Sequence, residues 1–438
     1  MNKSTQAEEP LGLGFCLFLV FIFEYFIRLS SRFSMIGSMR PTLLLVGVII
    51  LLILFGKNHY QRETSSNVTR IIITLIVYYF LSLPLVEYAL SSIRDNFADW
   101  FKALAFFFFT IYLVNTKRKF NILMVVFIAT QVFRILEPLY LHFTEGYWGD
   151  STYLGNGHFE ARLAGAPSDV INPNELGFVI VYTIGFLYYF WQRDSFLKKA
   201  LFWIAISLFC YALVLTMSRG AMVVLLVFLG FLLRKSRYKF LFLSLGITAG
   251  IAGWVQMDDV HKERYLSIFS SDTKFSSSSS GRIDGMIEEF ELGFSRPIVG
   301  HGVGTTREAK YHAFGGYQVS HNMYAEILIE MGLIGLIIFI SFMVKLKRCL
   351  EDIKVTSETV RQQVLGLQSV FWIFAVYSIN YWGLTQYYWY FLAGLAVSLW
   401  NIQQTSVELQ KDKVQCKGKK NSSLTAEKNG QLLYGYEK

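Results

Sequence analysis

The sequence predicts an all-α polytopic membrane protein with about twelve transmembrane helices and a partly helical extracytoplasmic loop before the tenth helix. Three observations support this fold class. The 438 residues are 53% hydrophobic and only 17% charged, whereas soluble domains carry about 25% charged residues. Many apolar runs approach the roughly 20 residues that a helix needs to cross a bilayer. Basic residues collect in short loops between those runs, as the positive-inside rule requires of cytoplasmic loops.

The predicted membrane helices follow the apolar runs along the chain. Their approximate bounds are 11–29, 40–56, 70–90, 100–115, 120–139, 174–191, 197–215, 219–234, 238–256, 323–343, 364–382 and 386–402. We divide the chain into an N-terminal part, 1–139, with the first five helices, and a second part, 140–404, with the other seven helices and the candidate functional residues. The Lys-rich segment 405–438 is expected to be a disordered cytoplasmic tail.

The charges of the loops predict the orientation in the membrane. The basic loops 117–119, 193–199 and 345–361 belong in the cytoplasm with both termini. The long polar intervals 140–172 and 257–322 then face outward. Because the net charge of +9 arises from the basic loops and the tail, it favours membrane orientation and not nucleic-acid binding.

The cysteines and the first apolar run give no sign of a disulfide-linked protein, a metal-binding protein or a cleaved signal peptide. The cysteines Cys16, Cys210, Cys349 and Cys416 are scattered over apolar runs, a basic loop and the tail, so they predict neither a disulfide framework nor a metal site. The first apolar run lacks a small-residue cleavage site and is expected to be a retained helix.

Some charged residues lie inside the predicted helices. Glu24 and Arg28 are spaced i,i+4, and Arg134 and Glu137 are spaced i,i+3. Such pairs can meet on one helical face. We expect each pair to be a structural anchor within its own helix.

Candidate functional residues fall in four polar clusters on the predicted outer side. The clusters contain Arg162 and Asn174 around the start of the sixth helix, Arg219 in a turn between two helices, Arg282 after a serine run, and His321 with Asn322 before the tenth helix. The loop between the last two clusters also holds Gly300, Gly302 and Gly304, which predict either a turn with aligned amides or an ordinary tight turn.

The two outer arginines differ in their predicted surroundings. Arg219 occupies a turn of almost no length, where an unpaired charge is costly. It therefore predicts a carboxylate partner, an anionic ligand or a snorkelling side chain at the headgroups. Arg282 is expected at the N-terminus of an amphipathic helix on the membrane surface, whose apolar face is Ile283, Met286, Ile287, Phe290 and Phe294. That position favours an anion, although a solvated arginine fits it equally.

His321 is the candidate general base, because an imidazole accepts a proton near neutral pH. His301 and His312 share its loop, so a metal site is conceivable, but no close ligand spacing supports one. Gly332 and Gly335, one turn apart in the following helix, predict close helix packing.

Five motifs in this order resemble a known family. They are Asn172-Pro-Asn174, Ser218-Arg219-Gly220, Gly281-Arg282, Pro297 to Gly304, and His321-Asn322 followed by Gly332 and Gly335. Across residues 167–335 this pattern is similar to that of the O-antigen ligase and polymerase superfamily of bacterial polytopic membrane proteins. The first five helices match that family only in number and hydropathy.

The resemblance implies a metal-independent, inverting glycosyltransferase without a cofactor in the bacterial cytoplasmic membrane, with its active site facing outward. The donor would be a glycan on undecaprenyl diphosphate, and the acceptor would be a hydroxyl of a lipid A core or another glycan. By position, His321 would be the base, and Arg219 and Arg282 would bind the diphosphate. Arg162, Asn174 and Asn322 would complete the substrate-binding set.

Two alternatives remain open. A polymerase of lipid-linked repeat units would carry similar motifs, and the spacing from His321-Asn322 to Gly332 and Gly335 only tilts the prediction toward a ligase in lipopolysaccharide or surface polysaccharide biosynthesis. A transporter of such lipids would show inverted repeats and interrupted helices with polar residues near the midplane. The sequence shows no internal repeat, and its informative polar residues cluster on one side.

Overall fold

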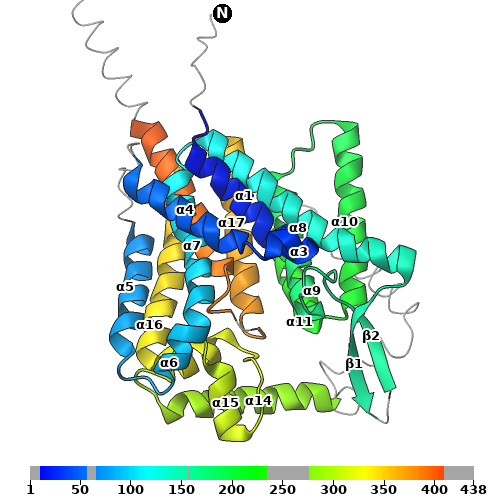
Figure 1. Cartoon of the computed structure of the whole chain (residues 1–438). Helices are drawn as coiled ribbons and strands as arrows, with labels where there is room; N and C mark the ends of the chain where they lie inside the picture. Colours follow the sequence, from blue (N-terminus) through cyan, green and yellow to red (C-terminus); the bar gives the residue numbers. More distant parts are fainter. Residues whose placement is uncertain (1–9, 57–65, 156–157, 234–275, 382, 409–438) are drawn as a thin grey trace, which may run out of the picture.

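The computed structural model describes residues 10–56, 66–155, 158–233, 276–381 and 383–408. Within these ranges the chain is mostly helical, as predicted (Figure 1). Each predicted membrane segment that falls within them contains a helix, although the segment predicted at 70–90 extends beyond its helix, which ends at Ser82. The segment predicted at 238–256 and most of the predicted tail lie outside the described residues.

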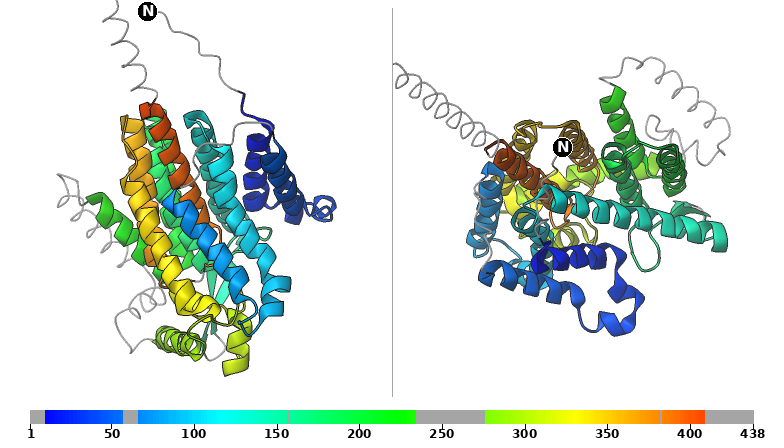
Figure 2. Two further views of the ribbon diagram at one scale, coloured as in Figure 1. Left: turned by 90° about the vertical axis from the view of Figure 1, so that its left-hand side faces the viewer. Right: turned by 90° about the horizontal axis from the view of Figure 1, so that it is seen from above.

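The N-terminal part of the chain contributes helices joined by short turns. Its elements are α1 (Leu13–Ile27), α2 (Leu29–Arg32), α3 (Ser34–Gly37), α4 (Pro41–Phe55), α5 (Asn67–Ser82), α6 (Ala89–Ser91), the π-helical turn η1 (Ser92–Asn96), α7 (Phe97–Leu113) and α8 (Lys117–Glu145). Helices α1 and α4 lie together on one flank of the molecule (Figure 2). Helix α8 runs across the predicted domain boundary at residue 139.

The second part of the chain begins with a β-hairpin. Its elements are β1 (Gly149–Gly155), β2 (His158–Leu163), α9 (Pro173–Phe190), α10 (Phe196–Thr216), α11 (Arg219–Leu233), α14 (Ser276–Ser295), α15 (Thr306–Phe314), α16 (Met323–Glu351), α17 (Glu358–Tyr377) and a last helix at 388–408. The strands pair antiparallel, with Gly149 opposite Leu163. The interval 140–172 therefore contains strands that the all-α prediction omitted.

Polar side chains at the helix starts explain why several helices begin where they do. Serine, threonine and asparagine oxygens accept backbone N–H groups that have no partner inside a helix. Such caps are Ser66, Thr116, Asn172, Ser195, Asn322 and Ser357.

Three helices among the described residues are long and apolar enough to cross a membrane, namely α8, α10 and α16. Helices α1, α4, α5 and α11 are shorter apolar helices. Large apolar side chains also face outward from the bundle, such as Leu51 at 55% and Ile337 at 64% exposure. Outward apolar surface on long apolar helices is what a multi-pass membrane protein presents to lipid.

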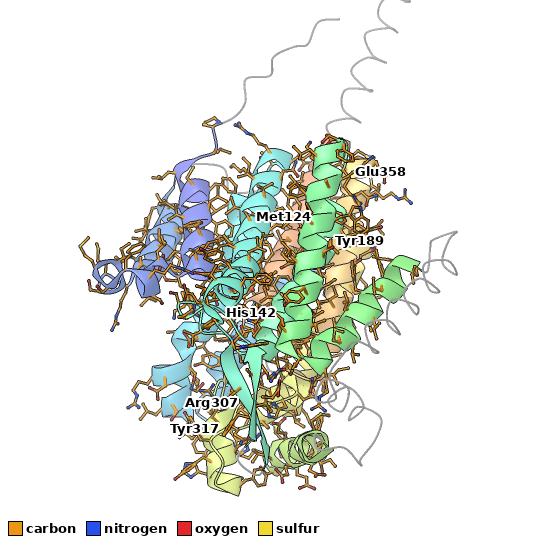
Figure 3. The ribbon with its side chains drawn as sticks, turned by 90° about the vertical axis from the view of Figure 1, so that its right-hand side faces the viewer. Met124, His142, Tyr189, Arg307, Tyr317 and Glu358 are labelled. Atoms are coloured by element: carbon orange, nitrogen blue, oxygen red, sulfur yellow. The ribbon has the colours of Figure 1, made fainter. Side chains whose placement is uncertain are left out.

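The loops segregate to opposite ends of the bundle, as their charges predict. The hairpin β1–β2, α14 and α15 lie at one end of the bundle. Helix α1 begins toward the other end, and the last helix, 388–408, ends there (Figure 1). Figure 3 likewise separates Glu358, which lies within the basic loop 345–361, from Arg307 and Tyr317 in the long polar interval. We call the end with α14 and α15 the polar-loop end.

Three of the four charged residues inside the helices form ion pairs with other elements, and Glu24 accepts the Ser30 N–H at 3.2 Å, so the expected pairs within one helix are wrong. The Arg134 guanidinium donates to Asp169 at 2.7 and 3.1 Å, and Arg32 donates to Glu137 at 2.6 Å. Arg28 lies 3.8 Å from Asp169. Because Asp169 and Arg32 lie outside the helices of their partners, local spacing could not reveal these pairs.

Helix α16 is interrupted at Gly332, whose φ is +64°. A Cβ at this position would collide with the backbone of Ile298. The break frees carbonyl groups, and the loop 297–304 binds them: His301 N–H donates to the Ile329 carbonyl at 2.7 Å and Gly302 N–H to the Glu330 carbonyl at 3.0 Å. Gly332 therefore permits a kink and a close loop, and not the helix–helix packing that was predicted.

Candidate functional site

His321 lies directly before α16, as predicted, and its backbone is fixed by a carboxylate. Its N–H donates to Glu289 Oε1 at 3.0 Å and Oε2 at 3.2 Å. The neighbouring Asn322 is buried, and its side-chain oxygen accepts the N–H groups of Tyr324 and Ala325 at 2.8 and 3.1 Å. Asn322 therefore caps the helix and holds His321 at its N-terminal end.

Glu289 is a residue that the sequence analysis missed. It is fully buried, at 0% exposure, although it belongs to α14, which was predicted as an amphipathic helix on the membrane surface. Its carboxylate accepts from Lys310 Nζ at 2.8 Å and from the Ser320 hydroxyl at 2.7 Å. One carboxylate thus joins α14, α15 and the turn that carries His321.

The prediction for α14 is wrong in one respect. The helix begins at Ser276, so Arg282 lies in its second turn and not at its N-terminus. On the predicted apolar face, Ile287 and Phe294 are 53% and 57% exposed, whereas the acidic Glu289 is buried. Positions 282 and 289 are two turns apart and share a helical face. The side chain of Arg282 lies outside the described part of the structure.

Arg219 is the first residue of α11, and its side chain is buried, at 9% exposure. The preceding turn is tight, because Met217 adopts a left-handed conformation with φ of +50°. Gly177 of α9 allows this turn to approach, since a Cβ there would lie 2.9 Å from the Ser218 side chain. The N-terminus of α11 is therefore held against α9, where its N–H groups favour an anion.

Arg162 and Asn174 bind one another and the same turn. Arg162 on β2 donates to Asn174 Oδ1 at 3.0 Å and to the Thr216 carbonyl at 3.0 Å. A third bond reaches the Thr152 hydroxyl at 3.3 Å. The buried guanidinium thus ties the hairpin and the start of α9 to the end of α10, and so positions the turn before Arg219.

The C-terminal end of α17 is the common neighbour of these segments. The Tyr377 hydroxyl donates to the Asn174 carbonyl at 2.6 Å, and Met323 N–H donates to the Ser378 carbonyl at 2.9 Å. A Cβ on Gly220 would lie 2.6 Å from the Asn380 amide nitrogen. Three of the four predicted clusters, which are far apart in the sequence, therefore meet the same four-residue segment, 377–380.

The two other histidines of the loop flank an aromatic ring. Tyr88 stacks on His301 and on His312, with ring centroids 6.0 and 5.6 Å apart. His301 Nδ1 also donates to Glu87 at 2.7 Å. Among the described residues, no three His, Cys, Asp or Glu side chains gather in a way that could hold a metal ion.

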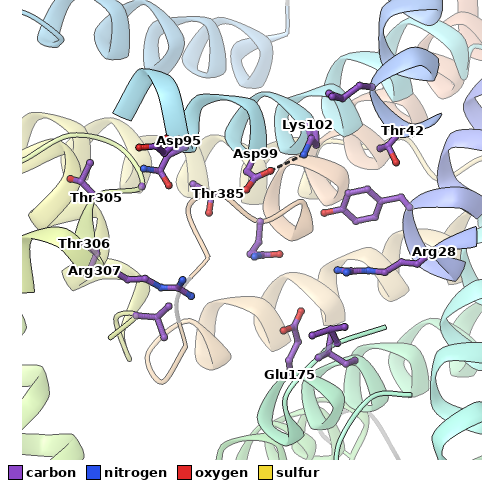
Figure 4. Close-up of a pocket in the computed structure, with 18 of the residues that line it drawn as sticks. Arg28, Thr42, Asp95, Asp99, Lys102, Glu175, Thr305, Thr306, Arg307 and Thr385 are labelled. Carbon is purple, nitrogen blue, oxygen red and sulfur yellow. Dashed lines mark hydrogen bonds and ion pairs between the residues drawn. The ribbon is translucent and has the colours of Figure 1, made fainter. Parts of the chain in front are cut away.

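A polar cavity of about 800 Å³ opens near the polar-loop end (Figure 4). This is the size of a ligand pocket. Its basic lining residues are Arg28, Arg40, Lys102 and Arg307. Its acidic lining residues are Glu24, Asp95, Asp99, Glu175, Glu308, Glu326 and Glu330. Arg28 and Arg307 extend toward the centre from opposite sides.

Several of the cavity carboxylates have defined partners. Glu175 accepts from the Tyr381 and Tyr388 hydroxyls at 2.9 and 3.0 Å. Glu326 Oε2 accepts the N–H groups of Gly383 and Leu384 at 2.7 and 3.1 Å. These contacts connect α9, α16 and the turn 383–385, so the cavity wall and the end of α17 form one framework.

None of the five predicted site residues whose side chains the structure describes lines this cavity, but chain neighbours of two of them do. Glu175 follows Asn174, and Ser320 precedes His321. The predicted residues therefore lie behind or beside the wall. The motif Pro297 to Gly304 reaches the cavity at Gly304, whereas much of the lining comes from parts of the chain that the motifs do not cover, including α1 and α15.

Long apolar helices, lipid-facing apolar side chains and polar loops gathered at one end define a multi-pass membrane protein with a polar cavity. A family model described as O-antigen ligase matches residues 201–340. This match confirms the resemblance to the O-antigen ligase and polymerase superfamily, and it covers Arg219, Arg282, His321 and Asn322. A comparison with curated proteins found no match.

Proposed function

We propose that this protein is a membrane glycosyltransferase of the O-antigen ligase type. It transfers a glycan from undecaprenyl diphosphate to a hydroxyl of a lipid A core or of another glycan, on the outer face of the bacterial cytoplasmic membrane. The observation that carries this proposal is the meeting of the Arg219 turn, the start of α9 and the His321 turn at residues 377–380, within and next to the matched region.

The proposed reaction is a single displacement with inversion. The acceptor oxygen bonds to the anomeric carbon, the bond from that carbon to the diphosphate oxygen breaks, and the hydroxyl proton passes to the His321 imidazole. Undecaprenyl diphosphate leaves with the bonding electrons. The contacts of Glu289 and Asn322 support this role, because a general base acts only from a fixed position.

Arg219 and Arg282 are proposed to bind the diphosphate. A guanidinium is always charged and binds phosphate in bidentate fashion, so it stabilises the charge that develops on the leaving group. Arg219 also stands at a helix N-terminus. Arg162 and Asn174 are proposed to act as positioning residues, because their hydrogen bonds hold the turn before Arg219.

Deletion of the gene tests ligase against polymerase. Loss of a ligase leaves long glycan on the lipid carrier and bare acceptor, which is the expected result. Loss of a polymerase leaves acceptor that carries a single repeat unit. The interruption of α16 is a feature that transporters also use. Here the loop 297–304 covers the break, so it offers little support for a transporter.

The outward orientation of the polar-loop end is tested by cysteine labelling. After the native cysteines are replaced, Gln318→Cys is expected to react with a membrane-impermeant reagent applied from outside, and Asp352→Cys is not. Labelling of position 352 alone contradicts the orientation. Chelators are expected to leave the transfer rate unchanged, and inhibition that added divalent metal reverses contradicts a metal-independent reaction.

A further inference from the structure

One carboxylate of the cavity has an oxygen without a partner. Glu330 is 2% exposed and lines the cavity. Its Oε1 accepts from the Thr306 hydroxyl at 2.7 Å and from the Thr306 N–H at 3.4 Å. The Gly304 N–H also lies near this carboxylate, but Oε2 is buried and accepts no hydrogen bond of good geometry from the described residues. A buried polar atom without a partner is costly, so its presence beside a cavity requires an explanation.

The backbone holds Glu330 in place. Its carbonyl accepts from Gly302 N–H at 3.0 Å, and the preceding Ile329 carbonyl accepts from His301 N–H at 2.7 Å. The kink at Gly332 follows two residues later. Because both the backbone and Oε1 are fixed, the carboxylate cannot easily turn to find another partner within the protein. Oε2 is thus a preorganised acceptor.

The surroundings of Glu330 favour a neutral, hydroxyl-rich ligand. The lining of the cavity includes residues with hydroxyl or amide groups, namely Thr305, Thr306, Ser320, Thr385 and Gln386. Acidic residues outnumber basic ones around the cavity, which disfavours a polyanion. The many polar side chains disfavour a lipid tail.

We infer that Glu330 binds a hydroxyl group of a sugar ring of the glycan substrate, with Oε2 as the acceptor and Thr306 as the residue that orients the carboxylate. This inference rests on the proposed glycan transfer and assigns the cavity to the sugar, while the diphosphate is left to Arg219 and Arg282. It also predicts a substrate class. At this position a neutral sugar hydroxyl is favoured over the carboxylate of a uronic acid, because an ionised carboxylate has no hydrogen to donate to Oε2 of Glu330.

The test uses the full-length protein in nanodiscs. The two probes are the lipid-linked glycan extracted from the deletion strain and undecaprenyl diphosphate without sugar. Glu330→Gln keeps the shape and the acceptor for Thr306 but replaces the unpaired oxygen by a donor. Thr306→Val is a second variant, which leaves the carboxylate intact. Glu291→Gln makes the same charge change on the exposed face of α14 and is the control.

The expected result is a loss of about tenfold to a hundredfold in affinity of Glu330→Gln for the lipid-linked glycan, as for a hydrogen bond to a charged group. Affinity for undecaprenyl diphosphate is expected to stay the same. Thr306→Val is expected to lose less, and Glu291→Gln nothing. If donor affinity is unchanged but the KM for the acceptor rises by a similar factor, the acceptor sugar occupies the site and the inference also stands.

Other outcomes overturn the inference. An equal loss for both probes assigns Glu330 to general folding of the site, and no change in affinity or KM removes it from binding. Wild-type protein that binds the two probes equally well, with acceptor KM independent of Glu330, overturns the sugar subsite while the proposed function stands. Wild-type protein that binds neither probe overturns both.

Discussion

Glu289 and Glu330 are both buried glutamates near the polar-loop end, yet their surroundings are opposite. Glu289 is enclosed between α14 and α15, and both of its oxygens are occupied by Lys310, Ser320 and the His321 N–H. Glu330 lines a cavity, and one of its oxygens has no partner in the described part of the chain. Burial alone therefore does not distinguish a structural carboxylate from one that binds a ligand, whereas the partners of each oxygen do.

His321 and the residues that hold it are expected to differ in the same way, since His321 is proposed to serve the reaction and its neighbours to serve the structure. If the Glu289 region exists to position the base, His321→Ala is expected to reduce transfer about 100-fold to 10,000-fold. The melting temperature is expected to stay near that of the wild type, because His321 is held through its backbone N–H. Turnover and thermal unfolding of the purified variant check this. Wild-type turnover would remove His321 from the mechanism.

Glu289→Gln is expected to destabilise the protein by about 3–5 kcal/mol, because Lys310 would be left buried without its counter-ion. Activity is expected to fall as well, through loss of the His321 position. The measurement is thermal unfolding in detergent. Glu291→Gln, two residues along on the exposed face of α14, is the matched control. Equal melting temperatures for Glu289→Gln and Glu291→Gln would show that Glu289 has no structural role, and its contrast with Glu330 would then be wrong.

Gly332 couples the loop 297–304 to α16 and thereby supports Glu330. Gly332→Ala is expected to cost about 2 kcal/mol from the left-handed conformation, with a further loss from the collision with Ile298. Gly316→Ala is the control, because its surroundings are open and its φ is not left-handed. Chemical denaturation of both variants measures the difference. A stable Gly332→Ala protein would mean that α16 can straighten without cost.

Arg219→Lys tests whether diphosphate binding requires the bidentate geometry of a guanidinium in addition to its positive charge. Lysine keeps the charge and loses the bidentate fork, so about a tenfold loss of donor turnover is expected without a change in melting temperature. Arg361→Lys, an exposed arginine of the opposite, basic end, provides the comparison. Donor kinetics equal to those of the wild type would contradict bidentate binding.

Substitution of Glu87 is expected to have the smallest effect on stability, because this carboxylate is partly exposed and, unlike Glu330, both accepts hydrogen bonds and contacts solvent. Burial by itself raises its pKa, but hydrogen bonds from His301 and Arg296 outweigh burial and lower the pKa below its ordinary value of 4.5. A lowered folded-state pKa gives stability that is present above pH 4.5 and is lost as the pH falls through the folded-state value.

Glu87→Gln is therefore expected to lose less than about 1 kcal/mol at neutral pH, since the ion pair is exposed to solvent. The difference from the wild type is expected to shrink as the pH falls below 4.5. Urea unfolding at several pH values measures it. A difference that grows on acidification would contradict the assigned direction.

Much of the fold was predictable because hydropathy and capping are local properties. A run of apolar residues specifies a helix with lipid-facing surface whatever the rest of the chain does, and Asn172 or Asn322 marks a helix start through its own next turn. The short hairpin β1–β2 escaped prediction, because its strands lie in a polar interval without a strong alternating pattern.

The sequence by itself determined the helical class, the separation of basic and polar loops, and the segments that carry Arg219, Arg282 and His321. Tertiary structure decided which side chains those segments meet. Arg134 pairs with Asp169, and Glu289 pairs with Lys310, because separate elements pack together. The kink at Gly332 likewise depends on a loop that arrives from residue 297 onward. The partner of a buried charge depends on which elements pack against each other. That packing depends on residues throughout the chain, so local sequence does not reveal it.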